Sequence, residues 1–563
     1  MLLALPPNQE PRQRRIGDAT MRDWWRDAVI YQIYPRSFQD DNGDGIGDLP
    51  GITRRLDHVA SLGVDAIWLS PFFTSPDKDM GYDVSDYTDV NPVFGTLADF
   101  DALVAKAHAL GLKVIIDQVI SHTSDQHPWF QESRQNKTNP KADWYVWADP
   151  QPDGTPPNNW PSVFGGSAWM FEARRRQYYL HNFLTEQPDL NFHNPEVVDT
   201  LLETMRFWLD RGVDGFRLDT VNFYVHDKLL RDNPPSGWTE FPGNPYEAQD
   251  HVFSKTQPEN IAILRRIRAL TDEYDARMLV GEVGDSIRPI EVMAEYTSGD
   301  DRLHMAYSFE FLGDAHTAEH FRSRITNFLK KAPNGWPCWS FSNHDVKRHA
   351  SRWTKPGGDV DAVARQSIAL LCSFPGTLGI YQGEELGQTE TDIEFHELTD
   401  LGYIDFWPDH KGRDGCRTPM VWEAHAHHAA FTTGVPWLPV KAPQAARAVD
   451  LQEADAESVL NAYRATLTFR KSRDELRLGT TEFPVLPEPL LAIRRSYGGK
   501  VLTGVFNLSD QAVDLTVEGK AQAVGPKAAT LAGGTLELPP NGFVFLEEEG
   551  AVILAPSKVT ALA

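Results

Sequence analysis

The segment VDGFRLD at residues 213–219 joins an apolar run to a charged end, and this combination is the pattern from which the fold can be predicted. Other short segments share its build. They are rich in β-branched or aromatic residues and do not strictly alternate, which favours strands buried on both faces of a parallel sheet. With the first, they make eight, and the others lie at residues 29–38, 64–71, 112–120, 277–283, 305–311, 336–345 and 378–385.

Charged and polar residues follow several of these segments at their C-terminal ends. Charge at the end of a buried strand is costly unless it faces a cavity. The pattern therefore predicts an α/β fold, a (β/α)8 TIM barrel whose active site lies at the C-terminal face of the strands.

The connecting segments support this prediction. Residues 99–110 place apolar side chains at helical spacing. Gly63, Gly111 and Gly212 each stand between such a pattern and the next strand, where a left-handed residue ends a helix and turns the chain back into the sheet.

Two regions depart from the repeat. Residues 122–188 are rich in Pro, Trp, Asn and Asp and too long for a loop, so we expect an inserted subdomain after the third strand. From residue 479 alternating strands predict a C-terminal antiparallel β-sandwich. The predicted organisation is a disordered leader at 1–23 with Met21 as a possible start, barrel segments at 24–121 and 189–478, the insert at 122–188, and the β domain at 479–563.

Composition narrows the function. The net charge of −25 over 563 residues opposes binding to nucleic acid or anionic lipid and favours neutral substrates. No window approaches the roughly 18 apolar residues of a membrane span. Three widely spaced cysteines are typical of a reducing compartment. We expect a cytoplasmic monomer or homodimer.

Residues suited to catalysis stand at the ends of the third, fourth, fifth and seventh predicted strands. Any one of them alone is better explained as a structural charge, but a barrel brings all these strand ends to one pocket. Carboxylates with Arg and His, without a thiolate or phosphate loop, suit glycoside cleavage, in which one carboxylate attacks and a carboxylic acid protonates the leaving oxygen. The residues are Asp117, His122, Arg217, Asp219, Glu282, His344 and Asp345.

Several of these strings together resemble, in order and spacing, the signature regions of glycoside hydrolase family 13, the α-amylase family. They are DQVISH (117–122), QPDLNF (187–192), GFRLD (215–219), GEV (281–283) and FSNHD (341–345). YQIYPRSF (31–38), MGYDVSDY (80–87) and GRDGCRTPM (412–420) narrow the resemblance to its oligo-1,6-glucosidase and α-glucosidase branch. The resemblance covers residues 24–422.

The resemblance implies a role for each residue. Asp219 would be the nucleophile, Glu282 the acid/base and Asp345 the carboxylate that grips sugar hydroxyls. Further binding roles fall on His122 and His344 (hydroxyl contacts), Tyr82 (stacking), Asp83 with Arg413 (the terminal 4-hydroxyl), and Arg217, which would hold Asp219 ionised. A pocket blocked at that 4-hydroxyl implies an exo-acting, retaining glucosidase.

Two positions bear on specificity. Ser121 stands where the family more often has Asn, so we expect a tuned site. Thr220 follows the nucleophile, where α-1,6 enzymes of the branch tend to carry Val, and it therefore favours α-1,4 substrates. Phe164 and Trp169 are candidates to line the sugar path or to form a core for the insert, and the sequence leaves both open.

Residues 40–48, DDNGDGIGD, space oxygen ligands around glycine turns as calcium loops do. The loop is not an EF-hand, because Gly51 stands where the bidentate Glu belongs. The alternative is a turn without metal. By resemblance to similar loops, we expect structural Ca²⁺ or Mg²⁺ at Asp40, Asn42, Asp44, the Ile46 carbonyl and Asp48.

The sequence thus predicts an α-glucosidase that hydrolyses short α-glucosides and transfers glucosyl groups to hydroxyl acceptors. One alternative is an oligo-1,6-glucosidase, or a sucrose- or trehalose-type glucosyl mutase of the same family. The other is a non-catalytic subunit resembling transporter-associated ectodomains. That alternative is disfavoured by the complete carboxylate trio and the lack of a membrane span.

Overall fold

The computed structural model describes residues 23–238 and 243–556, so the predicted leader lies almost entirely outside the described residues. Eight parallel strands form one sheet in the order β11-β10-β9-β5-β2-β1-β13-β12. A parallel bridge between Ala306 and Pro337 joins the two outer strands, so the sheet nearly closes into a barrel. The strands are β1 (Val29–Ile33), β2 (Ala66–Leu69), β5 (Lys113–Gln118), β9 (Gly215–Leu218), β10 (Met278–Val283), β11 (Met305–Ser308), β12 (Cys338–Ser340) and β13 (Thr377–Tyr381).

Seven predicted segments each contain one of these strands, and the eighth (378–385) overlaps β13, which begins one residue earlier. The barrel prediction is therefore confirmed. The main helices that follow the strands are α1 (Leu49–Ser61), α2 (Leu97–Ala109), α4 (Pro195–Asp210), α5 (Asn260–Thr271), α6 (Pro289–Thr297), α7 (Ala318–Lys331), α9 (Val360–Ser373) and α13 (Val459–Ser472). Shorter elements complete the connections: β3 (Phe73–Thr74), β4 (Asp86–Val90), α8 (His349–Trp353), α10 (Asp414–Arg417), α11 (Ala442–Ala445), α12 (Val449–Ala454) and α14 (Asp474–Leu478).

Local sequence explains where these helices begin and end. Thr96 caps α2, and its hydroxyl and the carboxylate of Asp99 satisfy each other's backbone N–H groups in a capping box. Gly63, Gly111 and Gly212 have φ of +82°, +79° and +94°. These left-handed residues stand between a helix and the following strand, as the sequence predicts, because a side chain there would be strained.

The region after β5 contains a three-stranded antiparallel sheet and one short helix. Its elements are α3 (Pro128–Ser133), β6 (Trp147–Ala148), β7 (Trp169–Glu172) and β8 (Gln177–Leu180). Trp169 is buried against Trp160 with ring centroids 6.0 Å apart, and its indole N–H donates to Asn158 Oδ1 at 2.7 Å. Trp169 therefore belongs to the small core of the insert.

The C-terminal residues form an antiparallel sheet domain, as predicted. Its strands pair in the order β14-β15-β16-β20-β17-β19-β18 within one sheet. One face packs on the barrel helices through residues such as Phe506 and Phe545, and the other encloses a separate apolar cluster around Leu515 and Leu536. The strands are β14 (Thr480–Glu482), β15 (Leu490–Tyr497), β16 (Lys500–Asn507), β17 (Val513–Ala528), β18 (Thr530–Ala532), β19 (Thr535–Leu538) and β20 (Phe543–Pro556).

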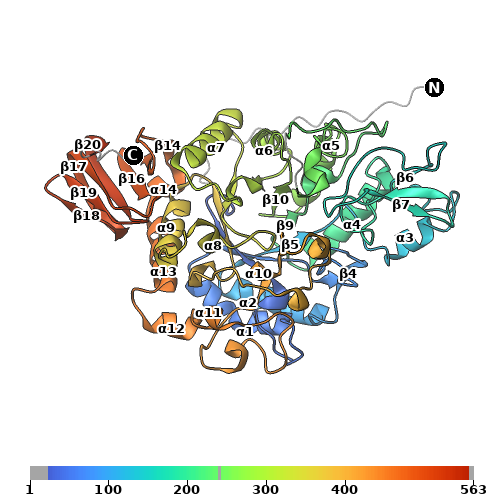
Figure 1. Cartoon of the computed structure of the whole chain (residues 1–563), viewed down its shortest axis with the longest axis horizontal. Coiled ribbons are helices and arrows are strands. Elements are labelled where there is room, and N and C mark those ends of the chain that lie inside the picture. The colour runs from blue at the N-terminus through green and yellow to red at the C-terminus, as the bar shows by residue number, and fades with distance from the viewer. Residues whose placement is uncertain (1–22, 239–242, 557–563) are drawn as a thin grey trace.

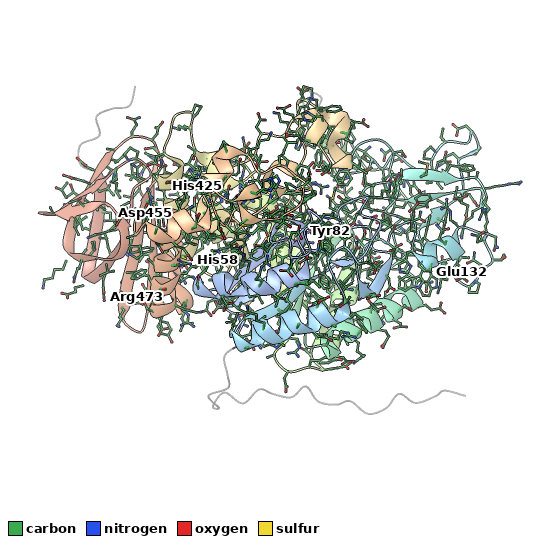
Figure 2. All side chains as sticks on the ribbon, turned by 90° about the horizontal axis from the view of Figure 1, so that it is seen from below. His58, Tyr82, Glu132, His425, Asp455 and Arg473 are labelled. Carbon is green, nitrogen blue, oxygen red and sulfur yellow. The ribbon has the colours of Figure 1, made fainter. Side chains whose placement is uncertain are left out.

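The insert and the C-terminal sheet lie at opposite ends of the long axis, with the barrel between them (Figure 1). Figure 2 shows Tyr82 in the middle of the molecule, between Glu132 of α3 and Arg473 beside the C-terminal sheet. In the described residues, no helix has the length and apolar character that crossing a membrane requires.

Candidate active site

A cavity of about 320 Å³ lies where the C-terminal ends of the barrel strands meet the insert. It contains polar groups from widely separated parts of the chain, as expected for the catalytic face of a barrel. Of the predicted site residues, those that line it are Tyr82, His122, Phe164, Asp219, Glu282, Asp345 and Arg413. These predicted residues thus share one cavity, and its geometry sets what each group can do.

Arg217 is the centre of the carboxylate cluster. It points inward from β9 and is fully buried. Its Nη1 lies 2.8 Å from Asp117 and 2.6 Å from Asp219, and its Nη2 lies 2.7 Å from Glu282. One guanidinium thus holds three carboxylates from β5, β9 and β10 in fixed positions, because its planar donors have defined directions.

The two candidate catalytic carboxylates also share neighbours. Thr220 donates its backbone N–H to Glu282 Oε2 at 3.1 Å and its hydroxyl to Asp219 Oδ2 at 3.2 Å. Its φ of +38° is left-handed, a strained conformation for a β-branched residue. Tyr307 of β11 accepts from Arg217 and donates to Glu282 Oε1 at 3.2 Å.

The charges of this cluster favour one bound proton on its carboxylates near neutral pH. Burial raises the pKa of both Asp219 and Glu282 to about 7, and Arg217 opposes that rise. Since one arginine cannot neutralise several buried carboxylates, we assign one shared proton to the pair Asp219 and Glu282 near neutral pH. Such a pair can supply both an ionised and a protonated carboxyl group.

Asp345 has a different environment. Its Oδ1 lies 3.1 Å from Arg413 and 3.2 Å from Arg417, and its Oδ2 lies 3.3 Å from His344. Burial alone would raise the pKa of Asp345, but the charges of Arg413 and Arg417 hold it below its ordinary value. Asp345 therefore stays ionised in the range where the other pair titrates.

A chain of hydrogen bonds fixes the tautomer of His344. Burial holds its pKa well below the ordinary value, so the ring is neutral. Gln32 donates to Nδ1 at 2.8 Å, which leaves the proton on Nε2 to donate to Tyr82 Oη at 2.5 Å. Tyr82 then donates to Asp117 at 3.1 Å, and its ring stacks on His344 at 5.2 Å. Tyr82 and His344 are thereby held as one rigid wall.

The prediction that Asp83 pairs with Arg413 is wrong. The Asp83 carboxylate is fully buried beneath a turn, where it accepts from the backbone of Lys78 and Asp79 at 3.0 Å each and from the Ser75 hydroxyl at 2.9 Å. Asp79 lines the cavity instead, 2.7 Å from Arg413 Nη2. Asp83 caps the turn that presents Asp79, and spacing alone does not distinguish the two.

Arg413 is also held by a residue that the sequence did not indicate. Asp400 Oδ1 and Oδ2 accept from its Nη2 and Nε, both at 2.8 Å. Asp400 lies in the long irregular stretch after β13, which carries no periodic pattern. Asp79 and Asp400 together fix the guanidinium at the closed end of the cavity.

His122 is connected to the nucleophile candidate through hydroxyl groups. Burial lowers its pKa to about 4, so it is neutral, and its Nε2 contacts the Tyr82 carbonyl at 2.8 Å. Its Nδ1 then accepts from Ser121 at 2.8 Å, and Ser121 Oγ lies 3.2 Å from Thr220 Oγ1. The unusual Ser121 thus hydrogen-bonds His122 and lies in contact with the residue that bonds Asp219.

Aromatic rings form much of the remaining wall. Phe164 lies in the lining and contacts Tyr403 with ring centroids 5.7 Å apart, which settles the choice left open by the sequence. The sequence did not indicate the other lining residues, because they lie in loops without a pattern. They include Phe183, Phe223, Tyr246, Lys255, Asp285, Phe309 and Tyr403.

The predicted ion loop lies outside this cavity. Its side chains accept backbone N–H groups of the same loop: Asp40 from Gly43 and Gly45, Asn42 from Asp44, and Asp44 from Ile46, at 2.7 to 2.8 Å. Asp48 caps α1 by accepting from Gly51 at 2.7 Å. In the described part of the chain, no three His, Cys, Asp or Glu side chains form a group able to hold a metal. The donors are nonetheless all oxygens, the type that Ca²⁺ and Mg²⁺ prefer.

The chain is similar in sequence and structure to several known proteins. A probable alpha-glucosidase of Rhizobium meliloti (strain 1021) is 58% identical over 498 residues, which cover 87% of this chain and 90% of the relative. The crystal structure of the alpha-glucosyl transfer enzyme XgtA superposes with a TM-score of 0.91 at 52% identity, covering 94% of this chain and all of that one. A mutant of MutB solved with the substrate sucrose gives 0.85 at 33% identity, with coverage of 94% and 100%.

The family comparison agrees with the barrel and the carboxylate cluster. Residues 32–479 match the catalytic domain of the alpha amylases. This match covers the insert and all but residues 24–31 of the two barrel segments, and it includes every residue placed in the cavity. The chain belongs to the alpha-amylase family, glycoside hydrolase family 13.

Proposed function

We propose that this enzyme is a retaining, exo-acting α-glucosidase that hydrolyses short α-glucosides and transfers glucosyl groups to hydroxyl acceptors. One observation carries the proposal: Asp219 and Glu282 both contact Arg217 in a pocket that Asp79 and Arg413 also line. The relatives named alpha-glucosidase and alpha-glucosyl transfer enzyme support both outcomes.

The first step divides the work of the pair. Glu282 in its acid form protonates the glycosidic oxygen while ionised Asp219 attacks the anomeric carbon, giving a glucosyl ester and a free leaving group. Arg217 keeps Asp219 oriented and favours its ionised form. Ionised Asp345 binds sugar hydroxyls and favours the positive charge that develops at the ring.

The second step reverses the roles. Glu282, now a carboxylate, removes a proton from water or from an acceptor hydroxyl, which opens the ester and releases glucose or a new glucoside with the starting configuration. The acceptor that reaches the ester first decides between hydrolysis and transfer. The same acid/base residue therefore serves both reactions.

The closed end of the cavity determines exo action. Arg413 bridges Asp79, Asp345 and Asp400, and Phe164 packs over its guanidinium at 5.2 Å. This block leaves room for a terminal sugar and none for a chain that continues past it. Asp79 and Arg413 would bind the terminal hydroxyls in place of the predicted Asp83 pair.

For linkage we propose α-1,4 over α-1,6, because Thr220 places a hydroxyl 3.2 Å from the nucleophile where an apolar Val favours α-1,6 substrates in similar enzymes. Assays on maltose and isomaltose in parallel test this. A clear preference for isomaltose would identify an oligo-1,6-glucosidase instead.

A glucosyl mutase is the second candidate, favoured by the likeness to MutB. A mutase retains both sugars in a closed pocket and gives an isomer as its main product. Product analysis on sucrose and trehalose distinguishes the two activities, since a hydrolase gives free glucose. A main product that is an isomeric disaccharide would overturn the α-glucosidase assignment.

The residue roles are tested by two substitutions. Asp219→Ala and Glu282→Gln should each reduce glucose release from maltose by at least about 10⁴-fold, because each removes a group that acts on the reacting atoms. Asp57→Asn, an exposed change on α1, is the matched control. Retention of more than a tenth of the activity by either active-site variant would contradict the assignment.

We propose that Ca²⁺ or Mg²⁺ binds the loop of Asp40, Asn42, Asp44, the Ile46 carbonyl and Asp48 as a structural ion. Structural calcium is common in this family. Removal of the ion with EDTA should lower the melting temperature by several degrees, and added Ca²⁺ should restore it. The residues of the cavity should keep their positions, because the loop lies outside the cavity. No bound metal and an unchanged melting temperature would contradict the proposal.

We further propose a cytoplasmic location and a monomeric or homodimeric state. The three cysteines are buried free thiols, as a reducing compartment permits. Fractionation and light scattering test these two points.

A further inference from the structure

Lys255 is an unusual group in the wall of the cavity. It lies in the loop before α5, is 4% exposed, and belongs to the cavity lining. Its Nζ donates to Tyr246 Oη at 2.8 Å and to the Gly284 carbonyl at 2.7 Å. The ammonium also packs on the ring of Phe223, 4.6 Å from its centroid. A buried charge in such a position requires compensation.

That compensation is incomplete. An ammonium has three N–H donors, and Tyr246 and Gly284 use two of them. Among residues 23–238 and 243–556, no carboxylate forms an ion pair with Lys255, and only the more distant charge of Asp285 favours its charged form. Arg217 and Arg413 in the same cavity each contact several carboxylates. Burial lowers the pKa of Lys255 to about 8, so it is charged at neutral pH. One donor of a buried cation is left for the cavity.

Lys255 lies on the side of the cavity that faces the leaving group. The acid that protonates the leaving oxygen must stand beside that oxygen, so the residues next to Glu282 face the leaving group. Gly284 follows Glu282 by two residues and accepts from both Lys255 and Asn222. The terminal sugar occupies the opposite end, between Tyr82, His122 and Arg413.

We propose that Lys255 is the acceptor-binding determinant of this enzyme: its free N–H binds a hydroxyl oxygen of the departing or incoming neutral sugar or polyol. The rings of Phe223 and Tyr246 flank the ammonium, with centroids 4.6 and 5.2 Å from Nζ, and all three residues line the cavity. A hydroxyl bound there is presented to Glu282 for deprotonation. This inference rests on the proposed function and names the class of molecule that its acceptor side accepts.

The test separates the two steps. With p-nitrophenyl α-glucoside as donor, nitrophenol release reports the glucosyl ester and glucose release reports its hydrolysis, so the difference measures transfer. Glycerol and maltose serve as acceptors. Lys255→Met keeps the length and apolar stem but removes all donors, and Lys106→Met on α2 is the control for a lysine outside the cavity.

We expect Lys255→Met to need about 10-fold more acceptor for half-maximal transfer, the effect of one lost hydrogen bond to a charged donor. Nitrophenol release should change by less than about 3-fold, and Lys255→Arg should restore part of the transfer. If Lys255→Met does not fold, Lys255→Gln replaces it.

An unchanged acceptor requirement would overturn the proposal. So would equal losses in both steps with a lowered melting temperature, since these would show that Lys255 only holds the Gly284 loop. Failure of the proposed function is distinct, because the unsubstituted enzyme would then release no nitrophenol.

Discussion

The two ends of the cavity differ in how their charges are compensated. At the closed end Arg413 contacts Asp79, Asp345 and Asp400 within 3.1 Å, so every charge has a partner before substrate arrives. At the open end the Lys255 ammonium hydrogen-bonds only to neutral groups among the described residues, and the nearby Asp285 carboxylate forms no ion pair with it. A rigid end whose charges are compensated suits one fixed sugar, whereas an end with a free hydrogen-bond donor suits acceptors of varied shape.

Among the changes that probe the difference between the two ends, the largest effect is expected at the closed end. Asp79→Asn removes a charge from Arg413 and a ligand for the terminal sugar, so kcat/KM for maltose should fall by about 100-fold or more. Asp83→Asn, four residues away, is the contrast: it weakens the turn by about 1–3 kcal/mol and should lower the melting temperature while KM changes little. Steady-state kinetics and thermal unfolding of both variants measure this. The opposite pattern would restore Asp83 to the site.

The carboxylate pair between the two ends, Asp219 and Glu282, should determine how kcat/KM depends on pH. Burial raises the pKa of Asp219 and Glu282, which share one proton near neutral pH, whereas the pKa values of Asp345 and His344 lie well below their ordinary values. Below neutrality Asp219 gains a proton and loses nucleophilicity. Above neutral pH Glu282 loses the proton that the leaving group needs. We therefore expect kcat/KM for maltose to fall about 10-fold per pH unit on each side of neutral pH.

A substrate control isolates the acid. The leaving group of 2,4-dinitrophenyl α-glucoside needs no proton, so its kcat/KM should keep the acidic limb and lose the alkaline one. The same alkaline limb for both substrates would contradict the role of Glu282 and place the titrating group elsewhere.

The smallest effect concerns the link between the closed end and the nucleophile. Ser121→Ala breaks the contacts to His122 and Thr220, and we expect a 3- to 10-fold fall in kcat, the value of one neutral hydrogen bond (roughly 0.5–1.5 kcal/mol). Ser121→Thr keeps the hydroxyl and should retain most activity. Equal losses in both variants would indicate packing around Ser121 in place of the hydroxyl contact.

Much of the site was predictable because the strands carry it. Asp219 and Glu282 stand at the ends of β9 and β10, and parallel pairing brings these ends together whatever the loops do. The same holds for Arg217, whose position two residues before Asp219 places both on one face of the strand. Tyr307 was missed because a tyrosine in a strand is usually explained as core.

Periodicity and strand-end chemistry are local, so the sequence was enough to predict the barrel and the C-terminal sheet and to nominate the carboxylate trio. Only the tertiary structure decided that Asp79 and not Asp83 meets Arg413, which is 334 residues away, and that Lys255 reaches the carbonyl beyond Glu282. Such contacts depend on how irregular loops pack over the barrel. No periodic pattern in the chain encodes that packing.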